Sequence, residues 1–545
     1  MNVEMLLHEC DDAAALLAVF LSRADVRSAS SFSKSVCVSS LRRNFLRAAR
    51  MQLPPASSEY IIKFLSNLSP HARDAISSSV FQSSTRGAAL ENLTLLDLSN
   101  AEVVEISALL RGAKQLKSLN LSGNADLEDF SPLEALEKLE YLNLQGTVVS
   151  SIKFLSKTPR IAELNLNATR NLVDLHPISC LTQLRAVYLS RKQIATLTPL
   201  LASAATLEHL QVMWTQFDEA MIDEWDFLFS KLSNLQHLNL LGVKKLISLT
   251  PVAQLTKLTY LNVQACPVDV LAPLRALENL ETLVLGWTNA YDFSALKSLT
   301  ELKRLDAQGK QLKSIEFLTE LEYFKGFGTL PRLPKTGRLQ EVSFCFSDDN
   351  FTFRLAGVKQ HLRALSLSGK FNLEEVVQTV PNLRQLELFI TDSMNLAAVG
   401  KLMQLRKLTI RFSRTSTIQG PQGFSFLGSL VRLRQLWLFK CEIADLSPLR
   451  SLKWLKILYI GSRALEDISP LKHLSELEKV HLGATTVSSV ECLQHLRNLQ
   501  SVVLPRCADC SCLVVQYGKQ LVNLKEVLHP AQNCIWTRHE EFCGN

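Results

Sequence analysis

The sequence predicts an α/β solenoid of about twenty short units, and two regularities support this fold class. From Leu93 to about His529 the pattern Leu-x-x-Leu-x-Leu, with other apolar residues at some of its positions, returns twenty times, and most units are 22 or 23 residues long. Six prolines each lie seven residues before the first leucine of the next unit: Pro132, Pro177, Pro251, Pro273, Pro448 and Pro470. A unit of this size cannot bury its own apolar face, so neighbouring units must stack on one another.

The first half of each unit predicts a short strand. In residues 139–147, alternation places Leu142 and Leu144 on one side and Tyr141 and Asn143 on the other. Parallel strands of this kind form a sheet with one face in the core and a concave face in solvent. The ninth position of a unit carries a small polar residue or cysteine, which we expect to satisfy backbone amides at the turn that follows. These residues are Asn124, Thr147, Thr169, Thr215, Cys266, Thr288, Cys441, Thr485 and Cys507.

The second half of each unit predicts a short helical or 3-10 turn on the convex side. Proline favours the first position of such a turn, and a preceding hydroxyl residue can cap it. Ser131, Thr250, Ser447 and Ser469 are placed for this role. A period of 22 residues leaves too little chain for a long outer helix.

The repeated pattern, as in Leu139-Glu-Tyr-Leu142-Asn-Leu144, resembles the leucine-rich repeat family over roughly four fifths of the chain. Its period is similar to that of the short-repeat class, which includes the regulatory subunit of type 1 protein phosphatase, bacterial internalins and many protozoan repeat proteins. The resemblance implies a horseshoe with a parallel concave sheet, an N-terminal α-helical cap and a binding function.

The region before the repeats divides into two segments. Residues 1–50 form either a helical cap or an F-box-like module, because residues 15–35 resemble the second half of an F-box although its usual Leu-Pro opening is missing. The F-box interpretation implies a set of adaptor-binding residues: Leu16, Leu17, Phe20, Leu21 and Val26. Residues 51–89 carry apolar residues at helical spacing and predict further capping helices.

The repeat array itself is expected to form two halves, residues 90–330 and 331–530, followed by a cap or tail at 531–545. Units of 19 and 18 residues begin at Leu302 and Leu321, and a register fault there would kink or subdivide the solenoid. Units of 28 residues begin at Leu207 and Leu405. Insertions in repeat arrays often map to one face and to binding.

Composition narrows the function further. Lys plus Arg number 59 and Asp plus Glu 52, a surplus too small to indicate nucleic acid by itself. We find no phosphate-binding glycine loop, nucleophile elbow or His-Glu-x-x-His pair, so we expect no enzyme and no cofactor. The apolar run 13–21 is too short to span a bilayer, and acidic residues precede it where a secretory signal needs basic ones. We therefore expect an intracellular, cytoplasmic protein, with the mitochondrion and the nucleus as alternatives.

The chain has twelve cysteines, and we expect their thiols to be reduced because the protein is expected to be intracellular. Near the C-terminus, Cys507, Cys510, Cys534 and Cys543 are weak candidates for a zinc site, and a capping disulfide is the other alternative to free thiols. We expect no metal.

The candidate binding residues are large aromatic and basic side chains at strand positions that face the concave side, since aromatic residues and arginine anchor interfaces. In the second half they are Arg411, Phe412, Arg434, Trp437, Phe439, Lys440 and Tyr459, and in the first half Tyr188, Trp214, Tyr260 and Trp287. The alternative is that these rings only pack on one another or on the insertion at 411–432.

The sequence thus predicts a non-enzymatic scaffold that binds a protein partner on its concave face. A more specific hypothesis, from the F-box resemblance, is the substrate-recognition subunit of a cullin-type ubiquitin ligase. The alternatives are a regulatory subunit of a signalling enzyme of phosphatase or cyclase type, or an assembly component of a ribonucleoprotein complex. RNA is a less favoured partner than protein, and no membrane contact is expected.

Overall fold

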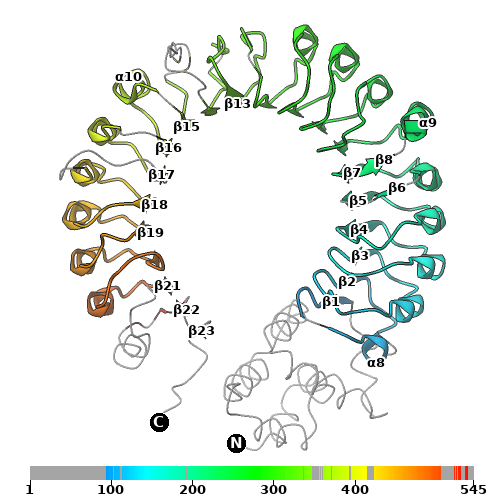
Figure 1. Cartoon of the computed structure of the whole chain (residues 1–545), viewed down its shortest axis with the longest axis horizontal. Helices are drawn as coiled ribbons and strands as arrows, with labels where there is room; N and C mark the ends of the chain where they lie inside the picture. The colour runs from blue at the N-terminus through cyan, green and yellow to red at the C-terminus, as the bar shows by residue number, and fades with distance from the viewer. Residues whose placement is uncertain are drawn as a thin grey trace, which may run out of the picture. The chain divides into compact units, whose positions relative to one another are not determined.

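The computed structural model describes residues 94–101, 103–110, 113–190, 193–194, 196–217, 219–310, 312–335, 337–345, 355, 358, 360–369, 371–391, 394–413, 423–504, 521, 523–524, 526–529 and 534–537. The predicted capping and F-box-like segments, 1–50 and 51–89, lie outside these residues. The chain divides into two compact units, Met1–Leu299 and Thr300–Asn545, rather than near residue 330. In each unit the strands lie on the inner side of the repeats and the helical turns on the outer side (Figure 1).

Unit 1 contains nine strands of one parallel sheet, each pairing with the strand of the next repeat at the same repeat position. They are β1 (Leu95–Asp97), β2 (Ser118–Asn120), β3 (Tyr141–Asn143), β4 (Glu163–Asn167), β5 (Ala186–Ser190), β7 (His209–Met213), β9 (His237–Asn239), β10 (Tyr260–Asn262) and β11 (Thr282–Val284). A separate pair joins β6 (Gln193–Ile194) and β8 (Gln216–Phe217).

Unit 2 continues the same pattern. Its strands are β12 (Arg304–Asp306), β13 (Tyr323–Phe327), β14 (Glu341–Cys345), β15 (Ala364–Ser368), β16 (Gln385–Ile390), β17 (Lys407–Phe412), β18 (Gln435–Cys441), β19 (Ile457–Ser462), β20 (Lys479–His481), β21 (Ser501–Val503), β22 (Glu526–His529) and β23 (Cys534–Thr537). All neighbours pair in parallel except β23, which is antiparallel to β22. Pairing runs in register through both short repeats, from β12 to β14, so the register fault that the sequence suggested there is not present.

The outer side carries one short helical element in most described repeats. In unit 1 these are α8 (Ser107–Leu110), η2 (Ser131–Ala135), η3 (Lys153–Lys157), η4 (His176–Cys180), η5 (Thr198–Ser203), η6 (Pro251–Gln254), η7 (Ala272–Ala276) and η8 (Ser294–Ser298). In unit 2 they are α10 (Leu373–Thr379), η9 (Ala397–Lys401), η10 (Ser425–Ser429), η11 (Ser447–Ser451), η12 (Ser469–His473) and η13 (Glu491–His495). The long repeat that begins at Leu207 uses its extra residues for the outer helix α9 (Glu219–Lys231).

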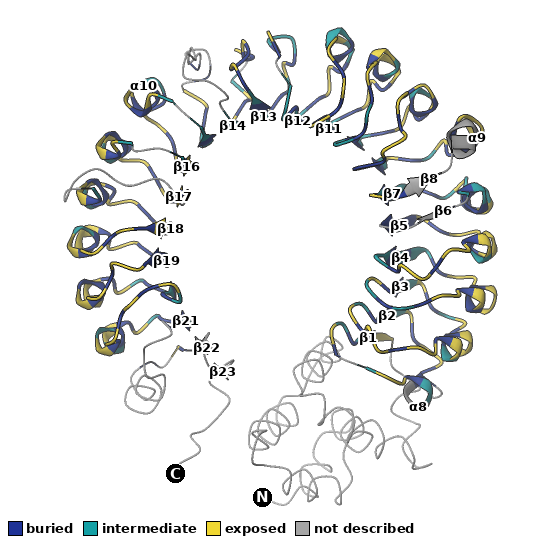
Figure 2. Cartoon of the chain, in the orientation of Figure 1, coloured by how far each residue is buried: buried dark blue, intermediate teal, exposed yellow. Residues whose placement is uncertain are grey.

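The core lies between the strands and the outer turns of each repeat, as the band of buried residues in Figure 2 shows. Leu139, Leu142 and Leu144 of the pattern are fully buried, and so is Leu133 on the turn η2 that packs against them. Burial of a leucine side chain contributes about 1.5 to 3 kcal/mol, so the repeated leucines supply most of the stabilisation. This confirms the fold class that the sequence predicts.

Hydrogen bonds at the ninth position differ from the expectation. Thr147, Thr288 and Thr485 donate their hydroxyl protons to the carbonyl oxygen three residues earlier, at 2.7 to 3.0 Å. Asn124 donates to the carbonyls of Leu98 and Leu121 and accepts from one amide, that of Val103. These residues therefore satisfy mainly carbonyls, not amides, because the turn points its carbonyl oxygens inward.

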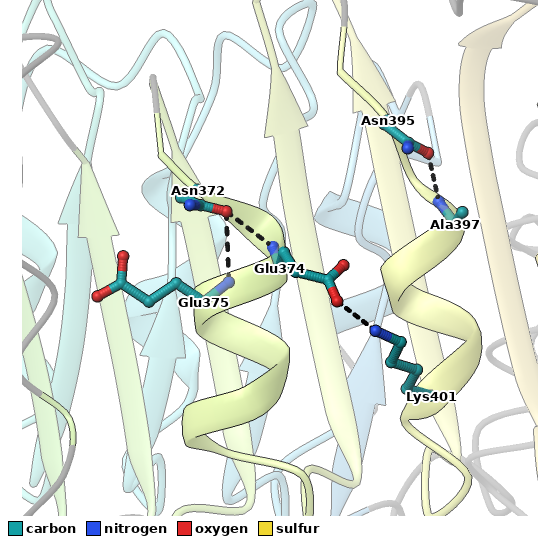
Figure 3. Close-up of polar contacts among 6 residues, drawn as sticks. All are labelled: Asn372, Glu374, Glu375, Asn395, Ala397 and Lys401. Atoms are coloured by element: carbon teal, nitrogen blue, oxygen red, sulfur yellow. Dashed lines mark hydrogen bonds and ion pairs between the residues drawn. The ribbon is translucent and has the colours of Figure 1, made fainter.

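The proline positions are confirmed, but the caps are not hydroxyl groups that directly precede proline. In η2, η11 and η12 the carboxylate two residues before the turn accepts from the first backbone amide: Asp129 from Ser131, Asp445 from Ser447 and Asp467 from Ser469. Figure 3 shows the asparagine version of this cap, in which Asn395 accepts from Ala397. In the same view Asn372 caps α10 by accepting from Glu374 and Glu375, and Lys401 of η9 contacts Glu374.

Candidate binding surface on the strand side

On the strand face of unit 1, asparagine recurs at the fifth position of five repeats. The side-chain oxygens of Asn120, Asn143 and Asn165 each accept from the backbone amide two residues later, at 3.0 to 3.1 Å. Asn239 and Asn262 repeat this contact at 3.1 and 2.9 Å. The fifth position in unit 1 therefore mainly holds the turn that ends each short strand.

In unit 2 the fifth position carries rings in three consecutive repeats, and β16 to β19 are six or seven residues long. The strand register places Thr409, Trp437, Tyr459 and His481 next to one another in four consecutive strands. Phe439, at the seventh position of its repeat, joins them. We name Trp437, Phe439, Tyr459 and His481 the aromatic ladder.

The rings of the aromatic ladder stack on each other. Trp437 and Tyr459 have centroids 5.7 Å apart with planes inclined by 18°, and Tyr459 and His481 lie 4.2 Å apart at 28°. Phe439 lies 4.3 Å from Tyr459 and 6.2 Å from Trp437. Because the ring faces are largely occupied by neighbouring rings, the ladder presents mainly ring edges, which carry the positive part of the aromatic quadrupole.

Polar groups border the ladder. The guanidinium of Arg411 lies over the Phe439 ring, and its Nε donates to Glu387. The indole Nε1 of Trp437 is buried and has no hydrogen-bond partner within the described part of the chain. Burial lowers the pKa of His481, whose Nδ1 accepts from the amide of Gly483 at 3.4 Å. The ladder thus offers an apolar surface with a nearby cation.

Phe412 does not belong to this surface. Its side chain is 3% exposed and packs edge-on against Phe424, with centroids 6.3 Å apart at 78°. The sequence interpretation placed the eighth position on the concave face. In β17 that position is still extended, so alternation turns Phe412 into the core.

Elsewhere the eighth position does leave the sheet. Trp214, Trp287 and Lys440 adopt left-handed backbone conformations with φ of 51°, 61° and 54°, and all three are exposed. Left-handed geometry costs roughly 1 to 2 kcal/mol in a residue other than glycine, and such strain concentrates at functional sites. Arg434, one residue before β18, is also exposed as predicted.

The candidate binding residues of unit 1 lie on different strands and have different neighbours. Tyr188 lies beside Glu163, and burial and that carboxylate raise its pKa. Tyr260 stacks on His237 at 3.9 Å and 4°, and His237 in turn lies 5.3 Å from His209. Burial, and then repulsion by His209, lowers the pKa of His237 to about 4. Trp214 covers Gly242 on the next repeat.

The binding residues selected from the sequence left out the histidines of both stacks, although the repeat pattern places His209 on the concave face. His209, His237 and His481 occupy the third or fifth position of their repeats, so the same register that selected Tyr260 and Tyr459 could have found them.

The described residues bear on two further features, metal sites and membrane-spanning helices. Across the described ranges, no cluster of three or more His, Cys, Asp or Glu side chains is arranged to hold a metal ion. Cys507, Cys510 and Cys543 lie outside those ranges, and of Cys534 the structure describes only its place in β23. The described cysteine side chains are free thiols, and burial raises the pKa of Cys266 and Cys441 to about 11. None of the described helices has the length and apolarity to cross a membrane.

Comparison with known proteins finds a repeat model and several proteins that are similar to this chain. A family model described as Leucine Rich repeats (2 copies) matches residues 431–473, which include Trp437, Phe439 and Tyr459. The Disease resistance protein RFL1 of Arabidopsis thaliana is 30% identical over 138 residues, which is 25% of this chain and only 16% of that protein. An internalin of Listeria monocytogenes is 20% identical, covering 87% of this chain and 94% of its own with a TM-score of 0.28. A Leptospira interrogans repeat protein is also 20% identical, at 82% and 97% coverage and a TM-score of 0.34.

Proposed function

We propose that this chain, which belongs to the leucine-rich repeat proteins, is a non-enzymatic scaffold that binds a partner protein at the aromatic ladder of unit 2. The observation that carries the proposal is the ladder itself. Rings occupy the fifth position of three consecutive repeats, at Trp437, Tyr459 and His481. Phe439 packs on them and Arg411 borders them. Aromatic rings with arginine have the composition of an interface anchor.

Packing of the rings on one another does not by itself account for the ladder. Stacking alone explains why the rings contact one another. It does not explain why the fifth position changes from asparagine to rings over these strands, because asparagine already closes the turn elsewhere.

The finer assignments rest on the sequence alone. We propose an intracellular location and, for residues 1–50, adaptor binding within a cullin-type ubiquitin ligase. The residues of that segment lie outside the described part of the chain. Regulation of a phosphatase or cyclase and assembly of a ribonucleoprotein remain the alternatives for the role of the scaffold.

Affinity purification with mass spectrometry tests the proposal. The full chain is compared with a Trp437→Ala/Tyr459→Ala variant and with Phe227→Ala, a matched control because Phe227 is 57% exposed on the outer helix α9. We expect a partner that is recovered by the wild type and the control but not by the ladder variant. Its affinity, measured by calorimetry, should fall at least about tenfold, or 1.4 kcal/mol. Equal recovery of the partner by all three chains would show that the ladder does not bind it.

The adaptor assignment needs its own comparison. The full chain and a chain lacking residues 1–50 are purified in parallel. We expect a cullin-ligase adaptor with the full chain only, and its absence from both purifications would eliminate this role while leaving ladder binding untouched.

A further inference from the structure

Five consecutive strands of unit 2 are each directly preceded by a basic residue. Arg363, Arg384, Arg406, Arg434 and Lys456 stand immediately before β15, β16, β17, β18 and β19. Each is hydrogen-bonded to the one before it, because the backbone amide of the later residue donates to the carbonyl of the earlier one at 2.7 to 2.8 Å. These five residues, which we name the basic row, therefore lie side by side across the sheet.

The repeat fold does not require this row. The same position in unit 1 carries mixed residues: Thr94, Lys117, Glu140, Ala162, Arg185, Glu208, Gln236, Thr259 and Glu281. Adjacent parallel strands are about 4.8 Å apart, so five like charges in sequence repel one another and oppose folding. A feature that costs stability and is absent from the other unit points to a ligand.

Most of the charge in the row is uncompensated. Lys456 pairs with Glu478 at 2.6 Å. Arg384, Arg406 and Arg434 are exposed, and the described residues offer them no ion pair. Arg411, on β17 outside the row, is engaged with Glu387.

Exposed apolar side chains lie at the same edge of the sheet. Met403 and Val431 stand two residues before the first leucine of their repeats, and Trp454 stands one residue before Leu455. They are 61%, 48% and 61% exposed and belong to three consecutive repeats. Single exposed apolar residues are ordinary on a protein surface, whereas their recurrence in three consecutive repeats, at the start of strands that follow unpaired charges, favours an interaction site.

We propose that this edge binds an extended acidic segment of the partner protein, which lies across the strands with carboxylates against Arg384, Arg406 and Arg434. Its apolar side chains contact Met403, Val431 and Trp454. Two strand spacings place Arg384 and Arg434 about 10 Å apart. Residues 1 and 5 of an extended chain, with residue 3 between them on the same side, are about 13 Å apart, and long arginine side chains can accommodate the difference. The inference rests on the proposed function, since it names the chemistry of the partner that the adjacent ladder binds.

A peptide fits this surface better than a single-stranded nucleic acid. Nucleic acid on such a surface needs open aromatic faces on which its bases can stack. Here Tyr459 is covered by Trp437, Phe439 and His481, at centroid distances of 4.2 to 5.7 Å. Carboxylates instead match the guanidinium groups, with which they form paired hydrogen bonds.

Fluorescence anisotropy with the full chain tests the inference. The probe is a labelled ten-residue peptide that alternates glutamate and leucine, and the comparison probes alternate serine or lysine with leucine or are a ten-nucleotide poly-uridine RNA. The variant Arg406→Glu/Arg434→Glu is matched by Arg450→Glu/Lys472→Glu, which makes the same charge change on the outer turns η11 and η12. Thermal unfolding by circular dichroism verifies that both variants fold.

We expect the glutamate probe to bind the wild type and the outer control alike, and the row variant at least about tenfold more weakly. Added salt should weaken the binding because the contacts are exposed. Met403→Ser/Trp454→Ser should weaken it as well. Equal binding by the row variant, equal binding of the serine probe, tighter binding of the RNA, or no binding of the glutamate probe at about 1 mM would each overturn the inference.

The two proposals fail separately. If partner recovery is insensitive to Trp437→Ala/Tyr459→Ala while the glutamate probe still depends on the basic row, the proposed ladder function is wrong and the acidic-segment inference stands. If the partner depends on the ladder while the probe ignores the row, the inference alone is wrong.

Discussion

The guanidinium carbon of Arg411 lies 4.2 Å from the centre of the Phe439 ring, while Nε of the same residue donates to Glu387 at 3.2 Å. One side chain on β17 thereby contacts both neighbouring strands, β16 and β18. A cation over an exposed ring is worth roughly 0.5 to 1 kcal/mol, and the ion pair with Glu387, half exposed, adds little. The main consequence is geometric, because Arg411 is held at the border of the aromatic ladder before any partner arrives.

Adjacent residues of β17 should respond oppositely to truncation. Phe412→Ala should lower the free energy of unfolding by about 3 to 5 kcal/mol, because it empties a buried site that Phe424 fills from the other side. Arg411→Ala should cost less than about 1 kcal/mol, since its contacts are solvent-exposed. Urea unfolding followed by circular dichroism measures both.

Arg411, unlike Phe412, should matter for partner binding more than for stability. Arg411→Ala should weaken partner recovery while the chain stays folded. A larger loss of stability from Arg411→Ala than from Phe412→Ala would contradict the assignment of Phe412 to the core.

The error at Phe412 shows what the repeat pattern does and does not determine. Leucine spacing predicts the strands up to the sixth position, because burial requires an apolar side chain there. The eighth position depends on whether the chain has already turned. It turns at Gly123, Gly146 and Gly242, whose φ lies between 71° and 76°, and does not turn where β17 runs on to Phe412. Glycine at this position was the available signal for the turn, whereas Trp214 and Trp287 show that a bulky apolar residue there does not by itself predict a continuing strand.

Gly242 offers a test of that left-handed position. An added Cβ would lie 2.2 Å from the ring of Trp214, and φ is +71°. Gly242→Ala should therefore destabilise the protein by more than the ~1 to 2 kcal/mol of left-handed geometry alone. In a Trp214→Ala background the same substitution should cost only that smaller amount. Gly461→Ala is the control, since its nearest contact would be an ordinary 3.5 Å and its φ is not positive.

Urea midpoints of the four chains in this cycle measure the coupling between Gly242 and Trp214. Equal costs of Gly242→Ala in both backgrounds would mean that Trp214 does not pack over the glycine.

Two threonines at the ninth position should respond with opposite sign to the loss of a hydroxyl. Thr147 donates to the carbonyl of Leu144 at 2.7 Å, so Thr147→Val should cost about 1 kcal/mol. The buried hydroxyl of Thr215 has no partner among the described residues, so Thr215→Val should leave stability unchanged or raise it by up to about 1 kcal/mol. Thermal unfolding of both variants decides the matter, and a clear loss in Thr215→Val would show that its hydroxyl is bonded.

Only part of the candidate site could be predicted from the sequence, because the repeat pattern assigns a face only to residues within the strand. Register places Trp437 beside Tyr459, so the ladder follows from the repeat alone. The exposure of Met403 and Trp454 does not follow, because they precede the strand, where the repeat pattern assigns no face. The caps on the outer turns were also missed, since the carboxylate of Asp129 lies two residues before the turn that it closes.

Acid should destabilise unit 1 through His237. Burial and the nearby His209 lower its pKa to about 4, below the unfolded value of 6.5, so between these pH values the unfolded chain binds a proton that the folded chain does not. The free energy of unfolding should therefore fall as pH decreases from about 6.5 to about 4. His237→Phe keeps a ring beside Tyr260 and should flatten the pH dependence in this window, whereas His176→Gln on the outer turn η4 should not. Urea unfolding at intervals from pH 7.5 to pH 4 measures the three slopes, and an unchanged slope in His237→Phe would show that the proton is taken up elsewhere.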